Sequence, residues 1–286
     1  TAMIVFFFFL INIGLNIVSR RSDGYHDLDM VMLPVGWRDI LEIVPSSTGA
    51  TTLSTSGNKV DCPPEKNLVY KAWNRMNEAV GQELPPVDIY LHKVIPDGAG
   101  LGGGSSDAAF TLTALNALFS LGLTQDRLCG IAATLGSDCP FFIHNRPMLC
   151  RGTGTEMTPV DINFGSVTHI VIAKPCGISV STAEAYSGVR PAVPDKTADE
   201  IATLLPPDQW TGRLTNGFEK HIFASRPSIA SLKDKLTASG AVYSSMSGSG
   251  SAVYGLFDDA KMAEAVADTI DGCDIFVGGI DPASCF

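Results

Sequence analysis

Positive charge is scarce in this sequence of 286 residues: 20 Lys and Arg stand against 30 Asp and Glu, which gives a net charge of −10 at pH 7. A chain this acidic has no general attraction for nucleic acids or anionic membranes, because both are polyanions. If the protein binds phosphate, it must do so locally, with backbone N–H groups and a few placed cations. We therefore expect small-molecule partners, and neither a nucleic-acid partner nor a membrane partner.

Closely spaced cysteine pairs are also missing. The seven cysteines are an odd number, lie scattered between positions 62 and 285 and form no C-x-x-C motif. This spacing argues against a zinc site or a disulfide framework and favours reduced thiols, as in a cytoplasmic protein.

Long apolar runs are missing too. The longest candidate, residues 3–11, has nine apolar residues and is interrupted by Asn12. It is too short to span a membrane, and it has neither the basic segment nor the small-residue cleavage site of a secretory signal. We expect this run to form a buried strand.

What the sequence does contain is a mixture of strand-like and helix-like segments in two unequal halves. The composition shifts toward Gly and Thr around residues 151–159, where we place a boundary between domains 1–157 and 158–286. Mixed elements of this kind predict an α+β architecture. Strands are expected at 3–18, 29–33, 39–44, 87–94 and 169–173, hairpin loops at 46–64, helices at 67–80, 105–121, 124–135 and 228–238, and a strand–loop–helix unit at 242–267.

The most informative segment is a glycine-rich loop between an expected strand and an expected helix. Five of the seven residues from 98 to 104 are glycine, so the backbone can approach a ligand in conformations that a Cβ forbids. Converging N–H groups and the following helix N-terminus can bind phosphate oxygens. The hydroxyls of Ser105 and Ser106 can donate to phosphate or help to hold Mg²⁺.

Three other interpretations of this loop are weaker. A flexible linker would not lie between a strand and a helix of the core. Gly98, Gly100 and Gly103 satisfy the dinucleotide pattern G-x-G-x-x-G, but residues 119–124 lack the acid expected about twenty residues further on. A Walker A loop requires a Lys after the glycines, and none is present.

The longer pattern P-x-G-A-G-L-G-G-G-S-S-D-A-A, from Pro96 to Ala109, resembles the phosphate loop of GHMP kinases, and its triple glycine resembles their diphosphocytidyl-methylerythritol branch. Two further segments, 12–26 and 246–252, resemble the first and third motifs of that family in the expected order. The resemblance implies the two-domain GHMP kinase fold, with a ribosomal protein S5 domain 2-like N-terminal domain that carries the ATP loop and a ferredoxin-like C-terminal domain.

The activity implied by this resemblance is ATP-dependent phosphorylation of the 2-hydroxyl of the diphosphocytidyl-methylerythritol acceptor, in non-mevalonate isoprenoid synthesis. Asp138, in the segment 135–142, matches the catalytic aspartate, which would accept or orient the proton of the acceptor hydroxyl. Without the resemblance, an Asp after a helix is more often a cap or turn residue. ATP is expected to arrive with Mg²⁺, whose ligands we leave unassigned.

The same resemblance implies two sets of binding residues. The ring of Tyr25 would stack on the cytosine, His26 would hydrogen-bond to it, and Tyr186 would close over it. Asn12 and Thr182 would contact other parts of the acceptor. The residues implied for ATP are Asn67, Lys93, Pro96, Gly98, Ala99, Gly100, Leu101, Gly102, Gly103, Gly104, Ser105 and Ser106.

One stretch departs from the family pattern. The first motif normally reads P-x-A-K-x-N, but here Phe7, Phe9 and Leu10 stand at the Pro, Ala and Lys positions. The missing ammonium would pair with the aspartate and stabilise charge at the phosphoryl group. Either catalysis is weakened in a chain that keeps its binding site, or this short stretch is an artefact of the sequence. We favour the second explanation, because the motifs downstream are intact.

Rival functions follow from these observations. Within the family, the acceptor could be a sugar, homoserine or mevalonate instead. Leu10 motivates a different class, a nucleotide-binding protein without catalysis. A dinucleotide-dependent oxidoreductase is the weakest rival. The sequence does not indicate an oligomeric state.

Overall fold

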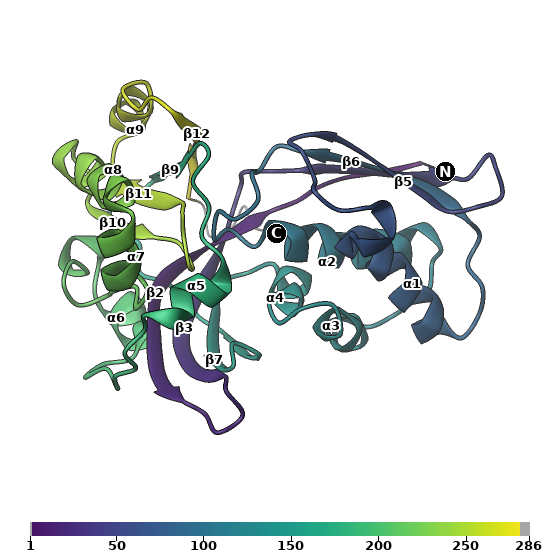
Figure 1. Cartoon of the computed structure of the whole chain (residues 1–286), viewed down its shortest axis with the longest axis horizontal. Coiled ribbons are helices and arrows are strands. Elements are labelled where there is room, and N and C mark those ends of the chain that lie inside the picture. The colour runs from purple at the N-terminus through teal and green to yellow at the C-terminus, as the bar shows by residue number, and fades with distance from the viewer. Residues whose placement is uncertain (1, 281–286) are drawn as a thin grey trace. The chain divides into compact units, whose positions relative to one another are not determined.

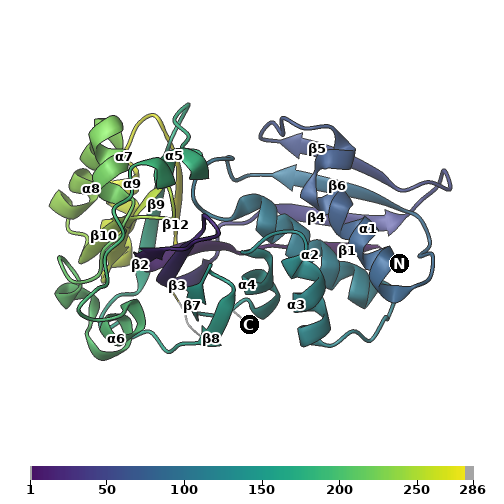
Figure 2. The same ribbon diagram turned by 60° about the horizontal axis from the view of Figure 1, so that its bottom comes forward.

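The computed structural model of the protein describes residues 2–280 and divides into two compact units, each discontinuous in sequence (Figures 1 and 2). Unit 1 contains the chain up to Phe9, Gly36–Asp97 and Gly102–Asn145, and unit 2 contains Leu10–Val35, Gly98–Leu101 and the residues from Arg146 onward. The expected domains, 1–157 and 158–286, are contiguous in sequence and so differ from these two units. Their boundary stays a prediction. Within residues 2–280, no helix has the length and apolarity needed to cross a membrane.

Unit 1 is a four-stranded sheet with helices packed on one face (Figure 2). The strand order is β1-β4-β6-β5, with β5 parallel to β6 and the other pairs antiparallel. The strands are β1 (Met3–Phe6), β4 (Ile40–Pro45), β5 (Thr52–Gly57) and β6 (Val87–Lys93), and the helices are η1 (Pro64–Lys66), α1 (Leu68–Val80), α2 (Gly103–Leu118), α3 (Gln125–Ala133) and α4 (Cys139–His144).

Helix α1 shows why its sequence forms a helix here. The Asn67 side chain accepts a hydrogen bond from the Val69 N–H and caps the start, and Gly81 ends the helix in a left-handed conformation. Val69, Ala72, Trp73 and Met76 recur at helical spacing and are buried, and α1 packs against α2. The predicted helix at 67–80 is thus confirmed.

Two predicted elements of unit 1 differ from the structure. The expected hairpin loops at 46–64 contain β5, which lies at the sheet edge and buries only Leu53, so its sequence lacks the apolar alternation of a typical strand. The expected single strand at 3–18 is two strands, because at residues 7–8 the chain leaves the sheet that contains β1 and enters the one that contains β2. At the break, the Phe7 ring stacks on Phe110 at 5.1 Å.

Helix α2 begins at Gly103, two residues before the expected start at Ser105. The residue before it, Gly102, has φ 71°, a conformation that glycine adopts without a Cβ penalty. Ser105 and Ser106 therefore lie inside the first turn and do not cap the helix.

Unit 2 contains two four-stranded sheets, in the orders β2-β3-β7-β8 and β10-β11-β9-β12. Strand β9 pairs antiparallel with both β11 and β12, and α8 and α9 pack on this sheet (Figure 1). The strands are β2 (Phe9–Arg20), β3 (His26–Val35), β7 (Met148–Gly152), β8 (Glu156–Pro159), β9 (His169–Pro175), β10 (Tyr243–Met246), β11 (Val253–Phe257) and β12 (Cys273–Gly279). The helices are α5 (Thr182–Ser187), α6 (Ala198–Leu204), η2 (Pro207–Gln209), α7 (Glu219–Ser225), α8 (Pro227–Ala238) and α9 (Ala260–Ala267).

Candidate active site

The second half of the glycine loop, from Gly102 onward, belongs to unit 1 and opens helix α2. Gly104 packs beside Leu68 at the start of α1, where a Cβ would lie 3.4 Å from the Leu68 Cδ1. The Ser106 side chain is fully buried and its hydroxyl donates to the Phe8 carbonyl at 2.6 Å. Ser105 remains half-buried. Of the two serine hydroxyls, the one of Ser105 is therefore better placed for a ligand.

Lys93, which the sequence places near ATP, lies directly behind this helix start. Its side chain is buried, and Nζ donates to Asp39 Oδ2 at 2.5 Å and to Asp107 Oδ2 at 2.7 Å. Asp39 Oδ1 accepts the N–H groups of Val94 and Ile95. We call Asp39, Lys93 and Asp107 the ionic cluster. It fastens α2, at Asp107, to the end of β6.

The charges of the ionic cluster do not balance, because two carboxylates share one ammonium. Burial lowers the pKa of Lys93, but the attraction of Asp107 and Asp39 outweighs it, so the pKa is raised. Burial and the negative charge of Asp39 together raise the pKa of Asp107 to about 7, against the opposing effect of Lys93. Asp107 Oδ1 has no hydrogen-bond partner among residues 2–280, which also disfavours the ionised form.

Asp138 stands immediately before α4, in the same unit as the helix start. The next residue, Cys139, is buried. Gly136, two residues before Asp138, lies close to the start of α2, since a Cβ there would be 3.3 Å from the Cys139 Sγ and 3.7 Å from the Ser105 Oγ. Desolvation raises the pKa of Asp138, which makes this carboxylate a better proton acceptor than an exposed one.

The first half of the loop, Gly98–Leu101, belongs to unit 2, where every one of its carbonyls accepts a hydrogen bond. The donors are Ser251 N at 3.2 Å, Ala252 N at 3.0 Å, Ser247 Oγ at 2.8 Å and Leu10 N at 3.1 Å, in the order of the carbonyls from Gly98 to Leu101. In a planar trans peptide the C=O and the following N–H point in opposite directions. The N–H groups of residues 99–102 therefore face away from these donors and are available to an anion.

The expected aromatic subsite also lies within unit 2. The Tyr186 ring stacks on His26 at 4.7 Å with an interplanar angle of 21°, and Phe218 meets Tyr186 edge-on at 4.9 Å. Tyr25 is 67% exposed at the tip between β2 and β3. In this structure one face of Tyr186 is thus covered by His26, while the Tyr25 ring is open to solvent. Thr182 is exposed at the first position of α5.

Asn12 and Leu10 lie on β2. Asn12 is buried, with Nδ2 3.5 Å from the Met30 Sδ, and its carbonyl accepts the hydroxyl of Tyr254 at 2.7 Å. Leu10 is buried and has no charge to offer, so its contribution is the backbone N–H given to Leu101.

Sequence reasoning missed Asp39. Its side chain is fully buried, and it is the second carboxylate, with Asp107, that binds the Lys93 ammonium. The available signal was an acid directly before the apolar strand that begins at Ile40, although such acids more often begin a turn.

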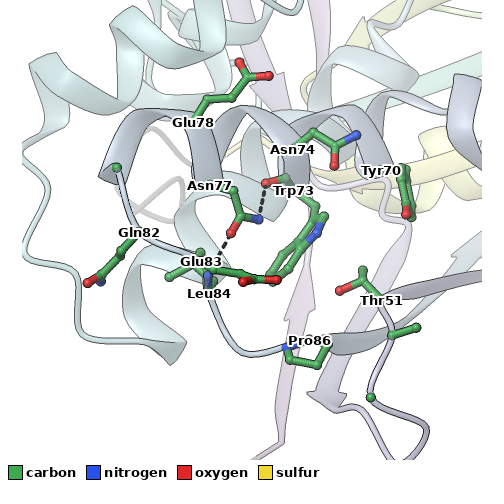
Figure 3. Close-up of a pocket in the computed structure, with 13 residues that line it drawn as sticks. Thr51, Tyr70, Trp73, Asn74, Asn77, Glu78, Gln82, Glu83, Leu84 and Pro86 are labelled. Atoms are coloured by element: carbon green, nitrogen blue, oxygen red, sulfur yellow. Dashed lines mark hydrogen bonds between the residues drawn. The ribbon is translucent and has the colours of Figure 1, made fainter.

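A hollow of about 790 Å³ lies elsewhere in unit 1, at the C-terminal end of α1 (Figure 3). Asn77 lines it. The Asn77 side chain donates to the Trp73 carbonyl and accepts from the Leu84 N–H, and Figure 3 draws these two hydrogen bonds as dashed lines. None of the site residues expected from the sequence lines this hollow.

Comparison with known proteins identifies the family. The GHMP kinases N terminal domain family matches residues 67–146, and the GHMP kinases C terminal family matches residues 190–272. The chain is 47% identical to a 4-diphosphocytidyl-2-C-methyl-D-erythritol kinase of Parabacteroides distasonis, over 87% of this chain and 89% of that protein. It is 42% identical to the kinase of the same name from Porphyromonas gingivalis, over 93% of this chain and 96% of that one.

Solved structures agree. A crystal structure of 4-(cytidine 5'-diphospho)-2C-methyl-D-erythritol kinase superposes with a TM-score of 0.81 at 33% identity, covering 97% of this chain and 98% of that chain. A homoserine kinase from Cytophaga hutchinsonii superposes with a TM-score of 0.73 at 17% identity, which shows the shared fold alone. The expected two-domain GHMP kinase fold is thus confirmed, and the chain belongs to the 4-diphosphocytidyl-2-C-methyl-D-erythritol kinase family of the GHMP kinases.

Proposed function

We propose that this chain transfers the terminal phosphoryl group of ATP to the 2-hydroxyl of 4-diphosphocytidyl-2-C-methyl-D-erythritol, a step of non-mevalonate isoprenoid synthesis. The observation that carries the proposal is the closeness, within unit 1, of the segment of Asp138 to the helix that follows the glycine loop: a Cβ on Gly136 would lie 3.7 Å from the Ser105 Oγ. A proton acceptor beside a phosphate-binding helix start is what transfer to an alcohol requires.

The phosphates of ATP would bind to the N–H groups of residues 99–102 and to the N-terminus of α2. These groups supply positive potential without side-chain cations, which suits a chain of net charge −10. The remaining glycines of the loop, with Pro96 and Ser105, would shape this cradle. Asn67, which caps α1, stays a proposal for adenine binding. Lys93 would act from behind the loop, because both carboxylates of the ionic cluster occupy its ammonium.

Catalysis would rest on positioning and on proton transfer. Asp138 would accept or orient the proton of the acceptor hydroxyl as oxygen attacks the phosphorus, and desolvation raises the pKa of this carboxylate toward the range where a general base works well. Mg²⁺ would neutralise charge on the phosphates, and the half-buried Ser105 hydroxyl offers a hard oxygen ligand that fits it.

The cytosine end of the acceptor would bind at the aromatic subsite. Tyr25 offers an exposed ring for stacking, and His26 and Tyr186 already lie face to face. His26 would give a hydrogen bond to the base, and Asn12 and Thr182 would contact the rest of the acceptor. Homoserine and mevalonate have no base for these rings, so an acceptor panel that favoured either one would contradict the substrate.

The first test is Asp138→Asn, assayed by phosphoryl transfer from labelled ATP. We expect turnover to fall by about 10²–10⁴-fold, the usual range for a positioned general base. Asp126→Asn, an exposed acid in the first turn of α3 of the same unit, is the matched control and should keep its rate. Equal rates for Asp138→Asn and the parent chain would remove the base assignment.

The second test concerns Leu10. We expect Leu10→Lys to raise turnover by about a hundredfold, the scale of one well-aimed electrostatic contact at a transition state. Leu10→Met is the uncharged control. The single change is preferable to restoring Pro at 7 and Ala at 9 as well, because Phe7 and Phe9 are fully buried and their loss would leave cavities. Calorimetry that shows both ligands bound, with no ADP formed by either variant, would favour a non-catalytic binding protein.

A further inference from the structure

The segment from Asn216 to Glu219 contains a buried amide whose hydrogen-bonding groups are all used within unit 2. Asn216 Nδ2 donates to the carbonyls of Met246 at 2.9 Å and Gly248 at 2.8 Å, and Oδ1 accepts the N–H of Phe218 at 2.9 Å. The side chain is 4% exposed. We call residues 216–219 the support segment. No motif in the sequence drew attention to it.

Glu219, at the other end of the support segment, binds the same stretch of chain near Met246, but through hydrogen-bond donors and not through carbonyls. Its Oε1 accepts the Met246 N–H at 2.9 Å and the Ser245 hydroxyl at 3.2 Å, and its Oε2 accepts from Lys233 at 2.8 Å. Carbonyls of the 246–248 turn are thus bound by an amide, and an N–H is bound by a carboxylate. This turn cannot shift without breaking bonds to the support segment.

The turn held in this way is the one that organises the first half of the glycine loop. Ser247 donates its hydroxyl to the Gly100 carbonyl, and the residues just beyond the turn donate to Gly98 and Ala99. Gly100 packs so closely on Ser247 that a Cβ would overlap the Ser247 carbonyl oxygen. The direction of the free N–H groups in the loop therefore depends on the position of the turn.

Phe218, inside the support segment, connects it to the aromatic subsite. The ring is 3% exposed and meets Tyr186 edge-on at an interplanar angle of 89°. Tyr186 in turn stacks on His26. Because the Phe218 N–H is bound by Asn216, the ring that orients Tyr186 is anchored to the same amide that holds the turn.

We propose that the support segment is a shared positioning element: Asn216 sets the geometry of the ATP loop, and Phe218 sets the geometry of the aromatic pair that receives the cytosine. This inference rests on the proposed function for the identity of the two ligands. It predicts that substitution of Asn216 changes the affinity for ATP, and that substitution of Phe218, two positions away, changes the affinity for the cytidine compound.

The first arm of the test is Asn216→Asp, which keeps an oxygen for the Phe218 N–H and removes both donors to the turn. We expect calorimetry to show Kd for a non-hydrolysable ATP analogue raised about tenfold, since two hydrogen bonds are lost. Kd for CDP should stay within about twofold of the parent value, a difference below 0.5 kcal/mol by the same conversion. Asn163→Asp is the matched control, because Asn163 Oδ1 accepts the N–H two residues ahead in the same way at 3.0 Å.

Asn216→Ser serves if the buried charge prevents folding. A serine hydroxyl can still accept the N–H two residues ahead, but it can reach at most one carbonyl. We expect the affinity for the ATP analogue to fall in this variant too, but by less than in Asn216→Asp.

The second arm is Phe218→Leu, which removes the edge contact with Tyr186 and keeps an apolar residue in the core. We expect the affinity for CDP to fall about five- to tenfold, the scale of one aromatic pair, with the affinity for the ATP analogue unchanged. Phe164→Leu, a buried Phe of unit 2 at 9% exposure, controls for lost volume.

The outcomes separate the two levels of inference. Failure of the parent chain to bind either ligand would overturn the proposed function itself. If the parent chain binds both, then equal weakening of both ligands in either variant, or no change in both variants, would show that the support segment is ordinary scaffold. Only the crossed pattern supports a positioning element.

Discussion

The two halves of the glycine loop are stabilised by different chemistry. Residues 98–101 are held by neutral hydrogen bonds to their carbonyls, given by one hydroxyl and three backbone N–H groups of unit 2. The half that begins at Gly102 is held in unit 1 by the ionic cluster, in which a buried ammonium links β6 to Asp107 of α2. One half depends on charge, and the other does not.

This difference predicts how each half tolerates change. Each neutral hydrogen bond contributes about 1 kcal/mol, so the loss of one leaves the remainder in place. Removing one member of a buried ion pair costs several times more, because it leaves the partner charged and desolvated. Mutation and pH should therefore affect the ionic half strongly and the neutral half weakly.

The largest effect is expected from Lys93→Met, which leaves Asp39 and Asp107 buried without a cation. The free energy of unfolding in urea should fall by about 3–5 kcal/mol. Ser247→Ala, which deletes the hydroxyl bond to Gly100, should cost about 1 kcal/mol. Lys71→Met, an exposed lysine of α1, is the control and should have little effect. Comparable losses of unfolding free energy for Lys93→Met and Ser247→Ala would contradict the proposed difference between the two halves of the loop.

A smaller effect is expected from adding a methyl group to the loop. Gly100 has φ +74° and would place a Cβ against the Ser247 carbonyl, so Gly100→Ala should destabilise the protein by about 1–3 kcal/mol. Gly104→Ala, in the first turn of α2, adds a Cβ that meets only Leu68 at 3.4 Å and should be neutral or slightly stabilising. Thermal unfolding of the two variants measures the difference, and reversed signs would contradict it.

A change of one pH unit should have the smallest effect on the free energy of unfolding. The pKa of Asp107 is raised from 3.8 to about 7, so between these values the folded protein holds a proton that the unfolded chain releases. Stability should therefore fall as pH rises through this window, by at most about 1.4 kcal/mol per pH unit. Asp107→Asn should flatten this slope in urea titrations, while the exposed Asp126→Asn should keep it. An unchanged slope in Asp107→Asn would place the titration elsewhere.

Elements with strong local signals could be predicted from the sequence. Strand β6 and helices α1 and α3 have clear apolar periodicity, and β9 is a continuous apolar run. Each lies where the sequence placed it within a few residues. The edge strand β5 and the short helices α5, α6 and α7 were missed. They are six or seven residues long, and in segments this short local propensity alone does not determine the structure.

The candidate site divides in the same way. The glycine loop and the Asp138 segment are contiguous in the chain, so their composition identified them. Asp39 and Asn216 could not be found in this way. The ammonium that Asp39 binds lies 54 positions away, and the carbonyls that bind the Asn216 amide lie 30 positions or more away. A single Asp or Asn carries no local sign that it will be buried and bonded to a distant segment.

By itself, the sequence determined the family, the glycine loop and the missing lysine at position 10, because these are properties of consecutive residues. Only the tertiary structure decided that Lys93 is paired with two carboxylates, that the Ser106 hydroxyl donates to the Phe8 carbonyl, and that the Asn216 amide holds the 246–248 turn. The physical reason is that hydrogen bonds and ion pairs of buried polar groups are chosen by folding, which brings their partners together from distant parts of the chain.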